Sequence, residues 1–399
     1  MGKYKLINNV LGWIVFAIAS TVYLMTMEPT ASFWDCGEFI SSAYKLEVGH
    51  PPGAPFFMLT ANLFTQLASD PSTVAKMVNT MSALFSGLTI LFLFWSITHL
   101  ARNIMVKDGE EASLGQMITV MGSGLVGALA YTFSDTFWFS AVEGEVYAYS
   151  SLFTAVVFWL ILKWEAVADK PHADRWIVLI AYLMGLSIGV HLLNLLCIPA
   201  IVLVYYYKKF PNPTMKGTLV ALLASFAIVA LMMYGVVQGL VEVCGYFELL
   251  FVNVLGMPYN SGVFAYVIIV AGVLIWSIWE TMRDEIHPTR MKIAFILSVV
   301  LIGIPFIGSG YVLAVILTAA LSLYLFKSKK VDIKTLNTIL VCLMVVVVGY
   351  SSYALTLIRA TADTPMNQNA PSDIFTLRTY LAREQYGKTP LLYGQTYVS

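Results

Sequence analysis

The chain has 399 residues, of which 59% are hydrophobic and only 12% are charged. Soluble domains carry roughly a quarter of charged residues, so this composition excludes an ordinary soluble enzyme and indicates a polytopic membrane protein. Basic and acidic residues balance at 23 each, and without a concentrated basic face no nucleic-acid partner is expected. The cysteines show neither metal-ligand nor disulfide-framework spacing, and we interpret most of them as inert apolar side chains: Cys36, Cys197, Cys244 and Cys342.

Apolar runs long enough to cross a membrane recur along the chain. A helix needs about 20 residues to cross about 30 Å of hydrocarbon. This criterion predicts an all-α integral membrane protein with about eleven transmembrane helices. The fifth and sixth predicted helices share one long apolar run, and the polar residues His191 and Asn194 mark the turn between them. The expected spans are 7–27, 78–100, 116–134, 145–163, 176–190, 192–207, 217–240, 262–280, 291–308, 309–327 and 335–357.

Lysine and arginine set the expected orientation, because basic residues of short loops are retained on the cytoplasmic side. With the N-terminus in the cytoplasm, 17 basic residues face inward and 6 face outward, and the C-terminus lies outside. The outer face then receives the loops 28–77 and 241–261 and the hairpin 135–145. We expect a transmembrane domain over 1–357. We interpret the expected outer tail 358–399 as the start of a truncated soluble domain.

The loop 28–77 holds the polar sequences that an apolar chain needs least. Phe33-Trp-Asp-Cys-Gly-Glu-Phe39 is followed by His50-Pro-Pro-Gly-Ala-Pro55. The prolines cannot continue a helix, and Gly53 lets the backbone approach a ligand closely. The apolar stretch from Pro55 to Leu67 is too short to cross the bilayer, so it predicts a helix that lies in the interface or re-enters the membrane.

Asp35 and Glu38 are the first candidates for chemistry. They are three residues apart, so if Asp35 opens or lies on a helix the two carboxylates share one face and could act on one ligand. Ionisable residues at membrane depth are functional candidates by default. The alternative is that outer carboxylates only avoid hydrocarbon and are solvated.

A second acidic pair lies in the hairpin where the fourth predicted span begins. Glu143 and Glu145, beside the aromatic residues Trp138 and Tyr147, could line a polar cleft of the size of a sugar. Solvation of both carboxylates at the membrane surface remains an equal alternative.

Three further polar residues are candidate ligand contacts. His50 precedes a proline, which favours an extended backbone and a presented side chain that binds a phosphate, orients a carboxylate or caps the turn. His191 and Asn194 could bond to a substrate, or form a satisfied interhelical contact. No paired histidines, paired cysteines, nucleophile elbow, Walker A sequence or dinucleotide fingerprint occurs, so neither a metal nor a cofactor is expected.

Four short motifs together resemble one known family. Trp34-Asp-Cys-Gly-Glu38 and Gly49-His-Pro-Pro-Gly53, with Gly144-Glu-Val-Tyr-Ala148 and Gly189-Val-His-Leu192, are similar to the protein O-mannosyltransferase-like membrane proteins of the GT-C class of glycosyltransferases. The resemblance extends from the first span through Gly394. It implies a GT-C-like helical bundle in a bacterial inner membrane, with a helical first periplasmic loop.

The activity implied by this resemblance is the transfer of a sugar, a hexose such as mannose, from a polyprenyl phosphate to Ser or Thr of an acceptor protein, on the periplasmic face and with inversion. In GT-C enzymes an acidic residue early in the first outer loop acts as the base, a role that falls here on Asp35. Glu38 would position the acceptor or the sugar, and Glu143 or Glu145 could bind the sugar.

The departing lipid phosphate needs positive charge or hydrogen-bond donors. His50, His191, Lys45 and an arginine of the tail are open candidates for this role. Two other classes of function are considered as well. A transporter or flippase predicts charges through the bilayer midplane and an inverted repeat, neither of which is evident. A non-catalytic scaffold for envelope assembly predicts that Asp35, Glu38 and His50 diverge from a common cleft.

Overall fold

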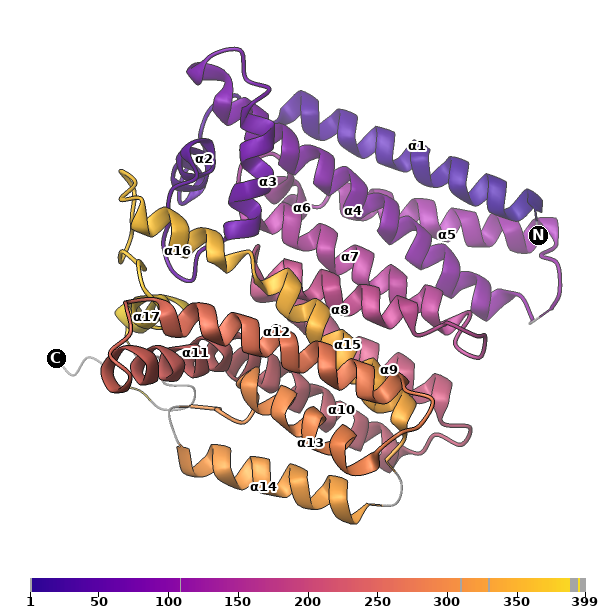
Figure 1. Cartoon of the computed structure of the whole chain (residues 1–399). Helices are drawn as coiled ribbons and strands as arrows, with labels where there is room; N and C mark the ends of the chain where they lie inside the picture. Colours follow the sequence, from indigo (N-terminus) through magenta and orange to yellow (C-terminus); the bar gives the residue numbers. More distant parts are fainter. Residues whose placement is uncertain (1, 108, 309–310, 329–330, 388–393, 395–399) are drawn as a thin grey trace. The chain divides into compact units, whose positions relative to one another are not determined.

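All the named secondary-structure elements of the described residues are helices (Figure 1). Over these residues, the only extended pairing is an isolated bridge between Val48 and Asn367. The expected all-helical fold is confirmed. Residues 388–393 and 395–399 of the expected tail lie outside the described residues. The computed structural model describes residues 2–107, 109–308, 311–328, 331–387 and 394.

Eight helical segments among the described residues are long and apolar enough to cross a membrane. Helices also occupy the other three expected spans, but they are shorter: α8 (Arg175–Ile188) and α13 (Pro288–Leu301) have 14 residues each and α14 (Tyr311–Lys327) has 17. At a rise of 1.5 Å per residue, a 14-residue helix is only about 21 Å long. The count of about eleven is therefore not confirmed. The eight segments are Gly2–Thr26, Pro71–Met105, Leu114–Thr132, Val146–Glu165, Leu192–Lys209, Met215–Val254, Ser261–Met282 and Ile333–Thr361.

The chain forms two compact units that do not follow chain order. Unit 1 contains Met1–Glu47, Ala54–Ala230 and Thr338–Tyr353. Unit 2 contains Val48–Gly53, Leu231–Asn337 and Ala354–Ser399. The expected boundary between a transmembrane domain and a tail at residue 357 stays a prediction.

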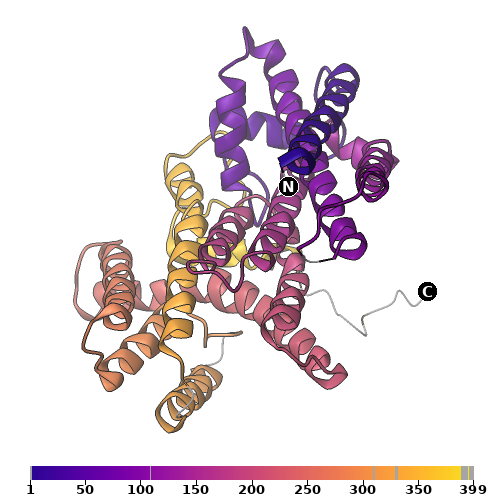
Figure 2. The same cartoon turned by 90° about the vertical axis from the view of Figure 1, so that its right-hand side faces the viewer.

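Unit 1 is built around α4 (Val74–Met105), which packs against α1 (Gly2–Thr26), α5 (Leu114–Thr132) and α7 (Val146–Glu165). These helices are the indigo to magenta group that runs side by side in Figure 1 and stays together in the turned view of Figure 2. Small residues allow this close packing, as is usual between membrane helices. A Cβ atom at Gly87 of α4 would lie 2.0 Å from the Ser20 hydroxyl of α1.

Short helices complete unit 1. The segment from Pro55 is indeed helical, which confirms a helix in the first expected outer loop. The predicted turn at His191 is confirmed too, because α8 ends at Ile188 and a 3-10 helix follows. These elements are α2 (Cys36–Lys45), α3 (Pro55–Thr65), η1 (Pro71–Thr73), α6 (Asp135–Ala141), α8, η2 (Leu192–Cys197), α9 (Ile198–Lys209), α10 (Met215–Ala230) and most of α15 (Ile333–Tyr350).

Unit 2 packs α12 (Ser261–Met282) against α11 (Gly239–Leu249) and α13. The segments before and after α11 are π-helical. Its other elements are η3 (Leu231–Gln238), η4 (Leu250–Val254), α14, the start of α15, α16 (Tyr353–Thr361), α17 (Ile374–Leu381) and η5 (Glu384–Tyr386).

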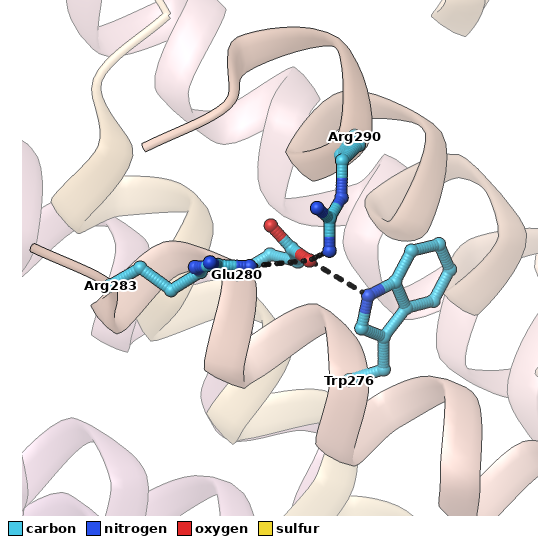
Figure 3. A network of polar contacts seen from close by, with 4 residues as sticks. All are labelled: Trp276, Glu280, Arg283 and Arg290. Atoms are coloured by element: carbon cyan, nitrogen blue, oxygen red, sulfur yellow. Dashed lines mark hydrogen bonds and ion pairs between the residues drawn. The ribbon is translucent and has the colours of Figure 1, made fainter. Parts of the chain in front are cut away.

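A buried carboxylate joins two helices of unit 2 (Figure 3). Glu280 of α12 is 0% exposed, and its Oε1 accepts hydrogen bonds from Trp276 at 2.9 Å and from Arg290 of α13 at 2.5 Å. The guanidinium of Arg283 lies 3.7 Å from the same oxygen. Removal of one partner would leave a buried charge uncompensated and lower the stability strongly. We therefore interpret this network as structural.

Candidate active site

Helix α2 carries the first acidic pair. Asp35 is its N-cap residue, so the condition that places Asp35 and Glu38 on one face is met. Cys36 and Phe39 are buried in a core shared with α3 and α4, where the ring centroids of Phe39 and Phe57 lie 5.4 Å apart. Asp35 is exposed, Glu38 is half-buried, and the Asp35 carboxylate makes no capping hydrogen bond. Burial of one helix face thus leaves both carboxylates on its polar side.

The buried face of α2 meets the second acidic pair. Cys36 is 1% exposed and Glu143 is 3% exposed, and the Cys36 thiol donates a hydrogen bond to the Glu143 carboxylate. Burial raises the pKa of the Cys36 thiol to about 12, and the negative charges of Glu143, Glu145 and Asp35 contribute to the increase. The thiol is therefore protonated at neutral pH. It acts as a hydrogen-bond donor and not as a nucleophile.

The same three side chains have the spacing of a metal site. Cys36, Glu143 and Glu145 each offer one ligand atom, and these atoms lie within 4.8 Å of one another. A thiol binds a metal ion as the thiolate, and the raised pKa of Cys36 opposes loss of its proton. The arrangement fits a hydrogen-bonded carboxylate better than a metal centre. That no metal is required stays a prediction.

A glycine allows the turn before α7 to reach α2 and α4. A Cβ atom at Gly144 would lie 2.9 Å from Oδ1 of Asn79 and 3.0 Å from the side chains of Ile40 and Val78. Any larger residue would push this turn away from α2. Since Glu143 and Glu145 flank Gly144, the close contact determines where both carboxylates lie.

Asn79 of α4 ties the segment after α1 to this turn. The Asn79 side chain is fully buried, and its Nδ2 donates to the main-chain oxygens of Glu28 at 2.6 Å and Thr30 at 3.0 Å. The main-chain nitrogen of Glu28 donates in turn to the oxygen of Val142 at 3.0 Å. Asn79 and Cys36 were missed as site residues. A lone asparagine in an apolar span was the available signal, since such groups bond between helices.

The two aromatic residues expected beside the second acidic pair have different surroundings. Tyr147, two residues after Glu145, is 42% exposed at the start of α7. Trp138 of α6 instead donates its indole N–H to the Thr26 hydroxyl of α1 at 3.1 Å. Tyr147 is therefore open to a ligand, whereas the polar edge of Trp138 is used to hold α6 against α1.

His191 and Asn194 also have different surroundings in the structure. The ring centroids of His191 and Tyr147 lie 5.4 Å apart, so His191 is beside the start of α7, where the second acidic pair lies. Nδ1 of His191 accepts from the main-chain nitrogen of Leu193. Asn194 is 0% exposed and its Nδ2 donates to the Ser187 hydroxyl of α8 at 3.0 Å. This bond fits the interhelical alternative for Asn194, and its role toward a substrate stays a prediction.

His50 belongs to unit 2 and is held there by a tyrosine. The hydroxyl of Tyr380 in α17 donates to the Gly49 oxygen at 2.6 Å, and Gly53 donates its N–H to the His50 oxygen at 2.9 Å. Gly53 has a φ of +73°, and a Cβ atom there would lie 2.6 Å from the Tyr380 hydroxyl. The close approach expected at Gly53 is thus made to Tyr380. Convergence of His50 with the carboxylates of unit 1 stays a prediction.

The part of the chain that holds both acidic pairs matches a known protein family. Residues 35–214 match the family described as "Protein O-mannosyl-transferase TMEM260 N-terminal domain". This segment is similar to a protein O-mannosyltransferase-like family. The predicted resemblance to the protein O-mannosyltransferase-like proteins is confirmed over these residues, and the GT-C class stays a prediction. The O-mannosyltransferase-like segment begins at Asp35 and includes Glu38, Glu143, Glu145 and His191.

Two curated relatives support the same assignment. The chain is 28% identical over 174 residues to protein O-mannosyl-transferase TMEM260 of Mus musculus, which covers 44% of this chain and 22% of the mouse protein. It is 26% identical over 187 residues to protein O-mannosyl-transferase tmem260 of Dictyostelium discoideum, which covers 45% and 21%. The chain thus spans about a fifth of the length of the curated relatives it matches. No solved structure is significantly similar to it.

Proposed function

We propose that this chain is a GT-C type membrane glycosyltransferase that transfers a hexose, in the first place mannose, from a polyprenyl phosphate to Ser or Thr of an acceptor protein. The observation that carries the proposal is the position of Asp35. Its carboxylate is exposed at the start of α2, next to the Cys36 thiol that meets the second acidic pair. The names of the relatives support O-mannosyl transfer to protein.

Asp35 is the general base of the proposed reaction. The acceptor hydroxyl oxygen forms a bond to the anomeric carbon while its proton passes to the Asp35 carboxylate. The bond between the anomeric carbon and the lipid phosphate breaks, and the phosphate oxygen takes the electron pair. A single displacement inverts the configuration. An exposed carboxylate without a capping bond supports this role, because it can reach an incoming hydroxyl.

The other acidic residues would position the reactants. Half-buried Glu38, on the same face as Asp35, would orient the acceptor or the sugar hydroxyls. Glu145 is half-buried and would bind the sugar, whereas Glu143 is almost fully buried and would position its neighbours through Cys36. His191, beside Tyr147, is a candidate donor to the departing phosphate.

The proposed setting is a bacterial inner membrane, with the N-terminus in the cytoplasm and the reaction on the periplasmic face. On the periplasmic face a lipid-linked sugar is available, but a cytosolic nucleotide sugar is not. Phe33 and Trp34 are 87% and 88% exposed beside Asp35, and they would give a prenyl chain an apolar contact. We propose neither a cofactor nor a divalent metal.

The proposal is tested with the chain reconstituted in lipid nanodiscs. A serine- and threonine-containing peptide is supplied with either labelled polyprenyl-phosphate mannose or labelled GDP-mannose, with and without EDTA. We expect transfer from the lipid donor only, and no effect of EDTA. Transfer from GDP-mannose would contradict the proposed donor. Absence of both transfer and binding of the lipid donor would contradict the proposed activity.

A further inference from the structure

Unit 1 holds a cavity at the end of its helices that lies away from the two acidic pairs. The cavity has a volume of about 720 Å³ and is formed where the start of α1 meets the ends of α4 and α7. Glu145 precedes α7 and Lys163 lies in its last turn, so the 20 residues of this helix separate the two places by about 30 Å. The cavity is therefore distinct from the candidate active site.

Positive charge dominates the lining of this cavity. Four lysine and arginine side chains face two glutamates, Glu110 and Glu111, of the loop between α4 and α5. Lys5 is close enough to Lys163 for their charges to repel each other. Like charges are held together at a cost that a bound anion removes. The four basic residues are Lys3, Lys5, Arg102 and Lys163.

Aromatic rings, and not carboxylates, orient two of these cations. The guanidinium of Arg102 lies 5.2 Å from the centroid of the Tyr4 ring, and the ammonium of Lys163 lies 4.7 Å from that of Trp159. Within the described part of the chain neither cation forms an ion pair. Nε of Arg102 is buried there without a hydrogen-bond partner. A buried donor in this state is destabilising.

We propose that this cavity binds the phosphate group of an anionic ligand. A guanidinium offers parallel donors that match two phosphate oxygens, and lysines add point charges. The side-chain amides of Asn8 and Asn103 supply further donors, and Trp95 and Trp159 form an apolar wall. The volume exceeds that of a bare phosphate and fits a phosphate ester. The ester can be a lipid headgroup, since basic pockets between membrane helices bind such groups, or a soluble phosphate compound.

The experiment uses the full chain in nanodiscs of phosphatidylcholine with a minor fraction of phosphatidylglycerol. Retention of phosphatidylglycerol after detergent extraction is measured by native mass spectrometry, with and without glycerol 3-phosphate as a soluble competitor. The double variant Arg102→Gln with Lys163→Gln is compared with a control of the same charge change in unit 1, Arg175→Gln with Lys216→Gln, whose residues lie outside the cavity.

We expect the cavity variant to retain phosphatidylglycerol about tenfold less than the wild type, and the control to retain it fully. If phosphatidylglycerol is not retained but glycerol 3-phosphate binds to the wild type and not to the cavity variant, the soluble source is identified. Equal retention and binding by all three proteins would overturn the proposal. If Arg102→Gln impairs folding, retention is measured for a second variant, Lys3→Gln with Lys5→Gln. This variant removes exposed cations only.

Discussion

The buried thiol of Cys36 donates a hydrogen bond to the buried carboxylate of Glu143, which joins α2 to the turn before α7. Cys36→Ala would leave this carboxylate without the donor, at a cost of about 1–3 kcal/mol in the free energy of unfolding. Cys36→Ser keeps a donor and should be milder. Thermal unfolding in detergent of the two variants checks this. Equal stability of Cys36→Ala and the wild type would refute the role given to the bond.

The same thiol predicts an unusual pH dependence. Burial, followed by the nearby carboxylates, raises the pKa of Cys36 to about 12 from an ordinary value of 9.0. Cys36 is 1% exposed and its reactive thiolate form is disfavoured, so alkylation by iodoacetamide should stay slow in the folded chain up to pH 10 and become fast when the chain is unfolded in denaturant. Mass spectrometry of the Cys36 peptide measures both rates, and a folded chain that reacts as fast as the unfolded chain would be inconsistent with this environment.

The raised pKa of Cys36 should also make the folded chain less stable at high pH. Above pH 9 the thiol ionises in the unfolded chain but stays protonated in the folded chain until about pH 12. The contribution of Cys36 to stability is therefore fully present below pH 9 and is lost as the pH rises through this window. Cys36→Ser should lose less stability than the wild type between pH 9 and pH 11.

Gly144 should tolerate no side chain. In Gly144→Ala the new Cβ atom would lie 2.9 Å from Oδ1 of Asn79 and 3.0 Å from Ile40, and such overpacking costs about 1–3 kcal/mol. Gly37→Ala in α2 is the matched control, because no atom lies within 4 Å of its Cβ and alanine favours a helix. Thermal unfolding should separate the two variants. A Gly37→Ala variant that is as unstable as Gly144→Ala would show that the packing argument is wrong.

Substitutions can distinguish a substrate-binding role from a structural role for His191 and Asn194. Asn194→Ala should lower the free energy of unfolding by about 1 kcal/mol and leave the affinity for the sugar donor unchanged, because its bond to Ser187 is buried. His191→Ala should raise the KM for the lipid-linked sugar donor with little loss of stability. Measurement of KM for the lipid donor and of the melting temperature distinguishes the variants. An unchanged melting temperature and a raised KM for Asn194→Ala would restore it as a substrate contact.

The sequence predicted the helices well because a membrane helix is specified locally. Each expected span contains a helix, and the break before His191 was visible as polar residues in an apolar run. The number of spans was less predictable. The apolar run near residue 291 extends to 308, but its helix ends at Leu301, before Gly303, which has a φ of +92° and lies against the backbone of Gly239. Only the packed structure reveals that close approach.

The candidate site was predictable only in part. The spacing of Asp35 and Glu38 follows from helix geometry, whereas the contact between Cys36 and Glu143 joins residues more than a hundred positions apart. Composition alone indicated an inert cysteine, because a buried thiol and a hydrogen-bonding thiol look the same in a sequence. Asn79 was overlooked for the same reason, as its partners lie after a different helix.

The role of Asp35 as the base is tested by comparing Asp35→Asn with Asp70→Asn in the mannose-transfer assay. Both variants replace an acid by its amide in the same expected outer loop. Asp70 is exposed and only caps a short helix through Ser72, which an asparagine can also do. We expect Asp35→Asn to fold normally but to lose transfer by at least about a hundredfold, and Asp70→Asn to keep the wild-type rate. A wild-type rate of transfer by Asp35→Asn would contradict this role.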